Sequence, residues 1–431
     1  MSDALHFERL DAWLEQQAQT PYGDEMLRQQ ARANGLELER RIDAAAAWAV
    51  LLDAEHNPEL HLESDCRPAL TRLKRSGLLD ALLLAQISAL LDVLDRLRQN
   101  SDEQPAPISG LTTALGDYED EAQRLRASVS GGGLLLDGAS AELGPLRKRL
   151  ESLRRKHADL ASNLRDELHA DGHLQDRYVT QREERHVLPV KASAKRQFGG
   201  VIHDASRSGK TAYVEPAQLL DAGNAVRLAE EAVSAEENRI IKRLSEILAP
   251  RADEINDDIT VLATLDSDRA RGAFGRRYDG VAPRFDKGRV RLQGLRPPAL
   301  LLADVEPVIA VDLELSDEAP ILVISGPNGG GKSVALTAAA WAFELAQRGL
   351  AIPAQDAVLP QPPFVLWPVV GDAADDRQAH STFSGHLEAL KQALEGAKTP
   401  SNVILIDEIC SGTEPMAGGA IACGFLETFA E

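Results

Sequence analysis

Residues 326–333 read Gly-Pro-Asn-Gly-Gly-Gly-Lys-Ser, a glycine-rich run with the spacing G-x-x-x-x-G-K-S. It follows an apolar run at 321–324 and precedes an alanine-rich stretch that begins at Val334. We expect a strand, a loop and a helix here, because the motif carries weight only in that context. Glycines let successive N–H groups turn into one hollow, and a helix N-terminus adds partial positive charge there. The run therefore predicts a phosphate-binding loop rather than a chance glycine-rich turn.

Two side chains of this loop have roles that follow from their chemistry. Lys332 is expected to reach the β- and γ-phosphates of a nucleoside triphosphate, and the Ser333 hydroxyl to bind Mg²⁺. The remaining nucleotide-binding positions surround the phosphates with backbone: Gly326, Pro327, Asn328, Gly329, Gly330, Gly331 and Val334. ATP and Mg²⁺ are the expected ligands.

A second motif lies downstream, where the apolar run at 403–406 ends in Asp407 and Glu408. An unbroken apolar run of this length is typical of a parallel strand buried between helices. Asp407 would hold Mg²⁺, directly or through water, and Glu408 would orient or deprotonate the attacking water. Either acid alone is more often a solvated strand end, but the pair after a phosphate loop favours ATP hydrolysis.

Two further segments make the pattern specific. Ser381-Thr382-Phe383 begins a periodic stretch and would by itself be read as a helix cap, and the loop at 411–415 reads Ser-Gly-Thr-Glu-Pro. In order and spacing, these segments and the two motifs resemble the MutS family of ABC-type ATPases. The resemblance implies that Ser381 acts in trans on the nucleotide of a partner subunit and that Asn328 lies near the γ-phosphate. It also implies that adenine packs against Val308 and Ile309, where the family often has an aromatic residue first.

Residues 175–216 resemble the second bacterial branch of that family, which lacks the mismatch-reading domain and is linked to recombination suppression and to stalled ribosomes. The stretch at 206–216 reads Ser-Arg-Ser-Gly-Lys-Thr-Ala-Tyr-Val-Glu-Pro. The resemblance implies a homodimer that sandwiches ATP and closes on structured nucleic acid, either branched DNA or the ribosome. The family continues past position 431 into further strands and a nuclease domain, so we expect the sequence to be an N-terminal fragment.

The periodicity of the chain, its motifs and the family resemblance together predict a multidomain protein with an all-α core, long antiparallel lever helices with a small β tip, and an α/β P-loop ATPase domain. The expected boundaries are 1–135 for the core, 136–284 for the levers with the tip at about 175–216, and 285–431 for the ATPase. The first lever is predicted by alternating three- and four-residue spacing, typical of a coiled-coil seam: Leu143, Leu146, Leu150, Leu153, His157, Leu160 and Leu164. The second is predicted at 217–247.

The net charge of −20 requires any nucleic-acid contact to be local. The candidate contacts are basic residues among glycine, serine and aromatic positions of the expected tip: Lys191, Lys195, Arg196, Arg207 and Lys210. A rival cluster, at 147–149 and 154–156, is either a second contact surface or a solvated helix face. Apolar stretches are too short for a membrane span, and three widely spaced cysteines form no disulfide framework, so we expect a cytoplasmic protein.

Two other functional classes remain open from the residues. A chromosome-organising ATPase carries its coiled coil between the phosphate loop and the signature helix, whereas here the coiled coil lies upstream. A nucleotide-bound structural dimerisation module without turnover would share the same motifs, and the acidic net charge keeps it under consideration.

Overall fold

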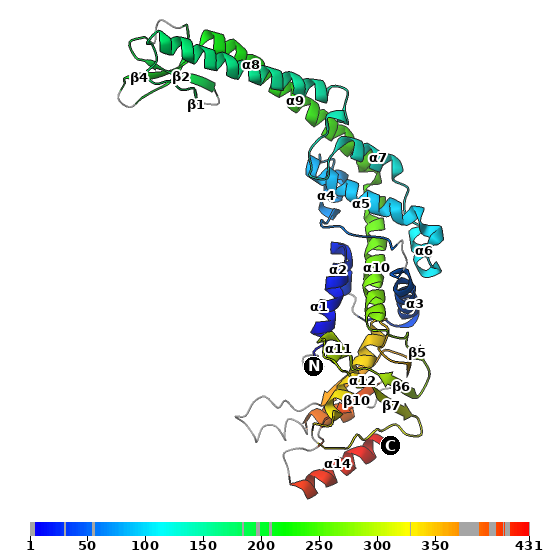
Figure 1. Ribbon diagram of the computed structural model, residues 1–431. Helices are drawn as coiled ribbons and strands as arrows, with labels where there is room; N and C mark the ends of the chain where they lie inside the picture. The colour runs from blue at the N-terminus through cyan, green and yellow to red at the C-terminus, as the bar shows by residue number, and fades with distance from the viewer. Residues whose placement is uncertain are drawn as a thin grey trace. The chain divides into compact units, whose positions relative to one another are not determined.

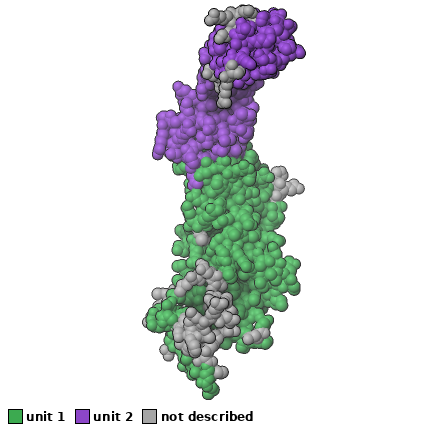
Figure 2. Space-filling view, turned by 90° about the vertical axis from the view of Figure 1, so that its left-hand side faces the viewer, with its two compact units in different colours: residues 1–65, 93–117, 255–431 green, residues 66–92, 118–254 purple. Residues whose placement is uncertain are grey.

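The computed structural model describes most of the chain. The described residues are 5–29, 32–53, 57–182, 185–194, 199–206, 209–327, 329–369, 388–395, 402–407, 409 and 414–430. The chain divides into two compact units (Figure 2). Unit 1 comprises residues 1–65, 93–117 and 255–431, and unit 2 comprises residues 66–92 and 118–254. No described helix is both long and apolar enough to cross a bilayer.

Helices dominate both units (Figure 1). They are α1 (Glu8–Gln17), α2 (Pro21–Gln29), α3 (Gly35–Leu51), α4 (Arg67–Lys74), α5 (Ala81–Gln99), α6 (Ala106–Thr112), α7 (Glu119–Ser128), α8 (Leu143–Ala170), α9 (Ala217–Leu248), α10 (Ala252–Arg277), α11 (Pro298–Leu302), α12 (Lys332–Gln347) and α14 (Pro415–Ala430). The strands are β1 (Thr180–Arg182), β2 (Arg185–Lys191), β3 (Gly200–Ala205), β4 (Thr211–Pro216), β5 (Arg284–Phe285), β6 (Arg289–Leu295), β7 (Val311–Ser316), β8 (Asp356–Leu359), β9 (Val365–Val369) and β10 (Asn402–Ile406).

The long helices α8 and α9 lie side by side in unit 2, as Figure 1 shows. Their bounds confirm both helices that the periodicity predicts. Leu143, Leu150, His157 and Leu164 are buried along α8, because a seven-residue repeat keeps one stripe of a helix facing its partner. The chain between the two helices folds back on itself, so the pair runs antiparallel.

A four-stranded antiparallel sheet, in the order β1-β2-β4-β3, is inserted between α8 and α9 in the sequence. Its apolar face packs on the last turns of α8, where Leu188 and Val214 meet Leu164 and Leu168. Its strands lie between residues 180 and 216, within the segment expected to be rich in β structure, and Figure 1 places the sheet at one end of the helix pair.

The core of unit 1 is built around α12, the helix that follows the glycine loop. Every residue from Ala340 to Gln347 is buried. The indole of Trp341 is fully buried, stacks edge-on against Phe7 at 5.2 Å and donates its Nε1–H to the Leu5 carbonyl at 3.0 Å. The N-terminal segment is therefore part of this core although it lies more than 300 residues away in sequence.

Two sheets flank this core. One has the order β5-β8-β6-β7, and its members β6 and β7 precede the glycine loop in sequence. The other pairs β9 with β10 in parallel, with Val365 opposite Asn402 and Val369 opposite Ile406. The strand expected to end at Asp407 is thus confirmed.

The apolar run at 321–324 forms no strand, so that expectation is wrong. Leu322 and Val323 are 46% and 68% exposed. An extended segment becomes a strand only when a neighbour satisfies its N–H and C=O groups. Among the described residues, β10 is paired with β9 and no strand pairs with 321–324.

Candidate nucleotide site

The glycine loop opens directly into α12. Gly329 and Gly331 have φ values of +82° and +84°, a left-handed conformation that glycine adopts without strain. Gly331 is the N-cap residue, so the free N–H groups of the first turn are presented at the end of the loop. The Lys332 ammonium folds over this loop and donates to the carbonyls of Gly326 at 2.9 Å and Pro327 at 3.1 Å. The loop thus brings a cation and a helix N-terminus to one place.

The other end of α12 is anchored by buried charges. Glu344 is fully buried and accepts hydrogen bonds from Arg348 at 2.7 Å and Arg32 at 2.8 Å. Arg348 also pairs with Asp11 of α1, and its carbonyl accepts from Arg271 Nε of α10 at 3.0 Å. Helix α12 is therefore held at its C-terminal end by three other segments of unit 1, which fixes the position of the loop at its N-terminal end.

Asp407 follows the last residue of β10, and its backbone N–H continues the ladder to Val369 at 3.0 Å. Helix α12 packs against β10, so Lys332, Ser333 and Asp407 are carried by neighbouring elements. The structure gives no ligand set beyond them, since no described group of three or more His, Cys, Asp or Glu side chains could hold a metal.

Several predicted site residues lie outside the described residues: Asn328, Ser381 and Glu408. Val308 and Ile309, the expected adenine contacts, precede β7. Ile309 is 81% exposed and Val308 is half-buried, so both present apolar surface outside the core. Their role stays a prediction.

The predicted tip contacts are partly described. Lys191 ends β2, is exposed, and donates its Nζ to the Gly172 carbonyl at 2.7 Å. Lys210 is exposed in the turn before β4. Lys195, Arg196 and Arg207 lie outside the described residues.

A buried polar cluster, which the sequence did not predict, lies where α8 meets the sheet. Nδ1 of His157 lies 3.4 Å from Nδ1 of His186. Fully buried Glu215 lies 2.8 Å from His203 Nε2 and 3.5 Å from Arg185. Burial lowers the pKa of His157, and the neighbouring His186 lowers it further. Only residue types are visible in a sequence, so these contacts between α8 and three strands had no local signal.

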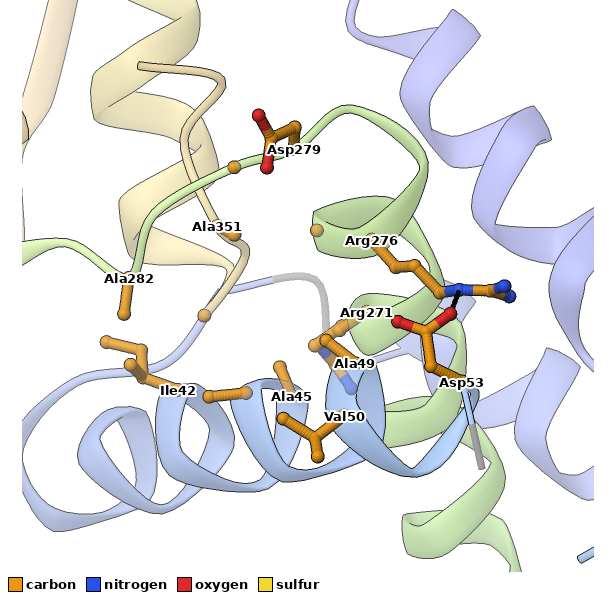
Figure 3. Close-up of a pocket in the computed structure, with 14 residues that line it drawn as sticks. Ile42, Ala45, Ala49, Val50, Asp53, Arg271, Arg276, Asp279, Ala282 and Ala351 are labelled. Carbon is orange, nitrogen blue, oxygen red and sulfur yellow. Dashed lines mark hydrogen bonds and ion pairs between the residues drawn. The ribbon is translucent and has the colours of Figure 1, made fainter. Parts of the chain in front are cut away.

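The structure also contains an open hollow of about 310 Å³ between α3 and the end of α10, within unit 1 (Figure 3). Small side chains such as Ala45, Ala49 and Ala351 line it, and Arg276 pairs with Asp53 at its rim at 2.5 Å. Residues of the glycine loop are not among those that line it, so this hollow is separate from the loop.

Comparison with known proteins points to one family. Residues 322–431 match the family described as MutS domain V. The chain is similar to an enzyme called Endonuclease MutS2 from an Anaeromyxobacter species, with 34% identity over 426 residues that cover 93% of this chain and 52% of the relative. Proteins of the same name from Pediococcus pentosaceus and Listeria innocua are 32% and 30% identical over 84% and 98% of this chain. The chain spans about half the length of these curated relatives.

Proposed function

Because the chain belongs to the MutS family, we propose that it forms part of a dimeric, Mg²⁺-dependent ATPase that closes on structured nucleic acid. The observation that carries this proposal is the glycine loop with Lys332 folded over it at the N-terminus of α12. Fold-level likeness alone would not carry a function, whereas a phosphate loop with its lysine in place is a chemical site.

The residues of the loop fit a nucleotide. The Lys332 ammonium uses loop carbonyls as its acceptors at 2.9 and 3.1 Å, and these are replaceable by phosphate oxygens. Among the residues that the structure describes, no atom beyond the chain neighbours lies within 4 Å of where a Cβ would stand at Gly329 or Gly331, which leaves this backbone open to close approach. A charge-assisted bond from Lys332 to phosphate is stronger than a bond to a neutral carbonyl.

In this proposal each residue has one task. Lys332 neutralises charge on the β- and γ-phosphates, and the hydroxyl of Ser333 and the carboxylate of Asp407 hold Mg²⁺, which polarises the phosphates when bound. Glu408 accepts a proton from the attacking water, and Asn328 and a partner's Ser381 orient the γ-phosphate. Val308 and Ile309 cover the adenine.

Nucleotide binding can regulate the protein only if it favours one of two states. The dimer interface is the element that the shared nucleotide would stabilise, with α8 and α9 carrying the change to the tip. There Lys191, Lys195, Arg196, Arg207 and Lys210 would contact the phosphate backbone of branched DNA or of ribosomal RNA.

The decisive test is ATP binding by the Lys332→Ala variant. A matched control is Lys287→Ala, because Lys287 is an exposed lysine of the same unit with no described ion pair. We expect Lys332→Ala to weaken binding at least tenfold, as measured by titration with a fluorescent ATP analogue, and Lys287→Ala to leave it unchanged. Equal affinity in the two variants would refute the phosphate-loop assignment. ATP binding without phosphate release would instead favour the structural dimerisation module.

A further inference from the structure

The basic residues at 147–149 and 154–156 of α8 fall into two sets that differ in their ion pairs. Arg147 donates to Glu237 of α9 at 2.7 Å, and Arg154 donates to Glu230 of α9, also at 2.7 Å. The two arginines are seven residues apart, as are the two glutamates, so these ion pairs repeat along the antiparallel seam. Their charge serves the contact between the two helices, and it is neutralised there.

The other set comprises four exposed cations: Lys148, Arg149, Arg155 and Lys156. None of them forms an ion pair within the part of the chain that the structure describes. Successive residues of a helix turn by about 100° around its axis. Lys148 and Arg155 therefore point to the back of α8, opposite its contact with α9. Arg149 and Lys156 point to the side of α8 that lies opposite Arg147 and Arg154, so none of the four cations points toward the acids that neutralise those two arginines.

We propose that this face of α8, formed by Lys148, Arg149, Arg155 and Lys156 and called here the outer face, binds the phosphate backbone of a double-stranded nucleic acid. The inference rests on the proposed function, and it adds a contact surface on the shaft of the helix pair to the contacts at its tip. The partner must be a polyanion, because the outer face presents four exposed cations and the segment 147–156 that carries it contains one acid, in a chain of net charge −20.

The spacing of the outer face predicts how many contacts it makes. The two pairs of cations are seven residues apart, which is about 10.5 Å along the helix at a rise of about 1.5 Å per residue. Phosphates of one strand of B-form DNA recur about every 3.4 Å along the duplex axis. The cations can therefore reach separate phosphates, and the loss of two of them should count as two lost contacts.

The experiment measures how affinity falls with salt for the 431-residue chain and three double variants. Two variants remove the outer face in halves, Lys148→Gln/Arg155→Gln and Arg149→Gln/Lys156→Gln. The control, Arg227→Gln/Lys242→Gln, removes the same charge from exposed positions of α9 that already have acidic partners, Glu231 and Glu246. Glutamine has nearly the helix propensity of lysine and arginine, so all three variants should keep the fold, which circular dichroism checks. The probes are a four-way DNA junction and an RNA duplex.

We expect each outer-face variant to lower the slope of log K against log salt by about 1.8, because each lost phosphate contact removes about 0.9. The control should leave the slope unchanged. If the slope falls with only one of the two probes, the result still supports the outer face and identifies the nucleic acid that it binds. If the parent chain binds and the outer-face variants keep its slope, the outer face is overturned while the proposed function stands. If the parent chain binds neither probe at low salt, the nucleic-acid part of the proposed function falls, and the outer face falls with it.

Discussion

Asp266 holds the turn between α1 and α2 against α10, and its removal should loosen this part of unit 1. Its carboxylate is fully buried and accepts from the N–H of Gln19 at 3.0 Å, the N–H of Thr20 at 2.8 Å and the Thr20 hydroxyl at 2.8 Å. The hydroxyl in turn accepts from the N–H of Gly23 at 2.9 Å. One side chain thus satisfies three donors that lie 246 or 247 residues away in sequence.

The loss of stability expected when Asp266 is removed follows from the burial of these donors. Thr20 is 3% exposed, so water cannot replace the carboxylate there, whereas Gln19 is partly exposed. An unsatisfied buried donor costs about 1–3 kcal/mol, so we expect Asp266→Ala to destabilise the segment by about 3 kcal/mol. Asp266→Asn keeps one acceptor oxygen and should cost about half as much. Gly23→Ala should act in the same direction, because its Cβ would overlap the Asp266 carboxylate.

Hydrogen exchange of α2 is the suitable assay, since a chain with two units need not unfold in one step. The amides of α2 make no bond to Asp266, so their exchange reports on the loss of packing rather than on the loss of the acceptor itself. A cost of 3 kcal/mol predicts exchange roughly 100-fold faster. The control is Asp257→Ala, an exposed acid of the same helix. Equal protection of α2 in the Asp266 and Asp257 variants would refute the reasoning.

Two more predictions concern the cluster at α8 and the chemistry of hydrolysis. The pKa of His157 is lowered in the folded state, so the folded protein binds fewer protons than the unfolded chain below about pH 6.5, and stability falls as the pH drops through that value. His157→Leu should fit the apolar seam and reduce this loss of stability, which is measured as the difference in urea midpoint between pH 7.5 and pH 5.5. If the variant keeps the parent's difference, the pH dependence of stability comes from groups other than His157. Glu408→Gln should keep ATP binding and slow phosphate release by about 10²-fold or more, the usual scale for an acid–base group. Release at the parent rate would remove Glu408 from the mechanism.

The sequence predicts what is local and periodic. The seven-residue repeat from Leu143 to Leu164 specified α8, because the repeat reflects which side of the helix is buried. The glycine loop was equally visible, since φ values such as that of Gly331 demand a particular residue type. These features need no knowledge of distant parts of the chain.

What the sequence could not predict depends on long-range pairing. The run at 321–324 has the composition of a strand, yet strand formation requires a neighbour that no local pattern supplies. Likewise, Arg147 and Lys148 are adjacent and chemically similar, but only the position of α9 decides that Arg147 is neutralised by Glu237 and that Lys148 is left exposed. The arrangement of Asn328, Ser381 and Glu408 stays a prediction.

The hydrogen bond from Trp341 to the Leu5 carbonyl also affects the order in which the protein folds during its synthesis. The two residues are 336 positions apart, and a ribosome adds about 5–20 residues per second, so Trp341 is made roughly 17–67 s after Leu5. For that time the apolar side chains of Leu5, Phe7, Leu10 and Leu14 have no α12 to pack against. This apolar segment is therefore buried only long after it has been made, and it should be a binding site for chaperones on the nascent chain.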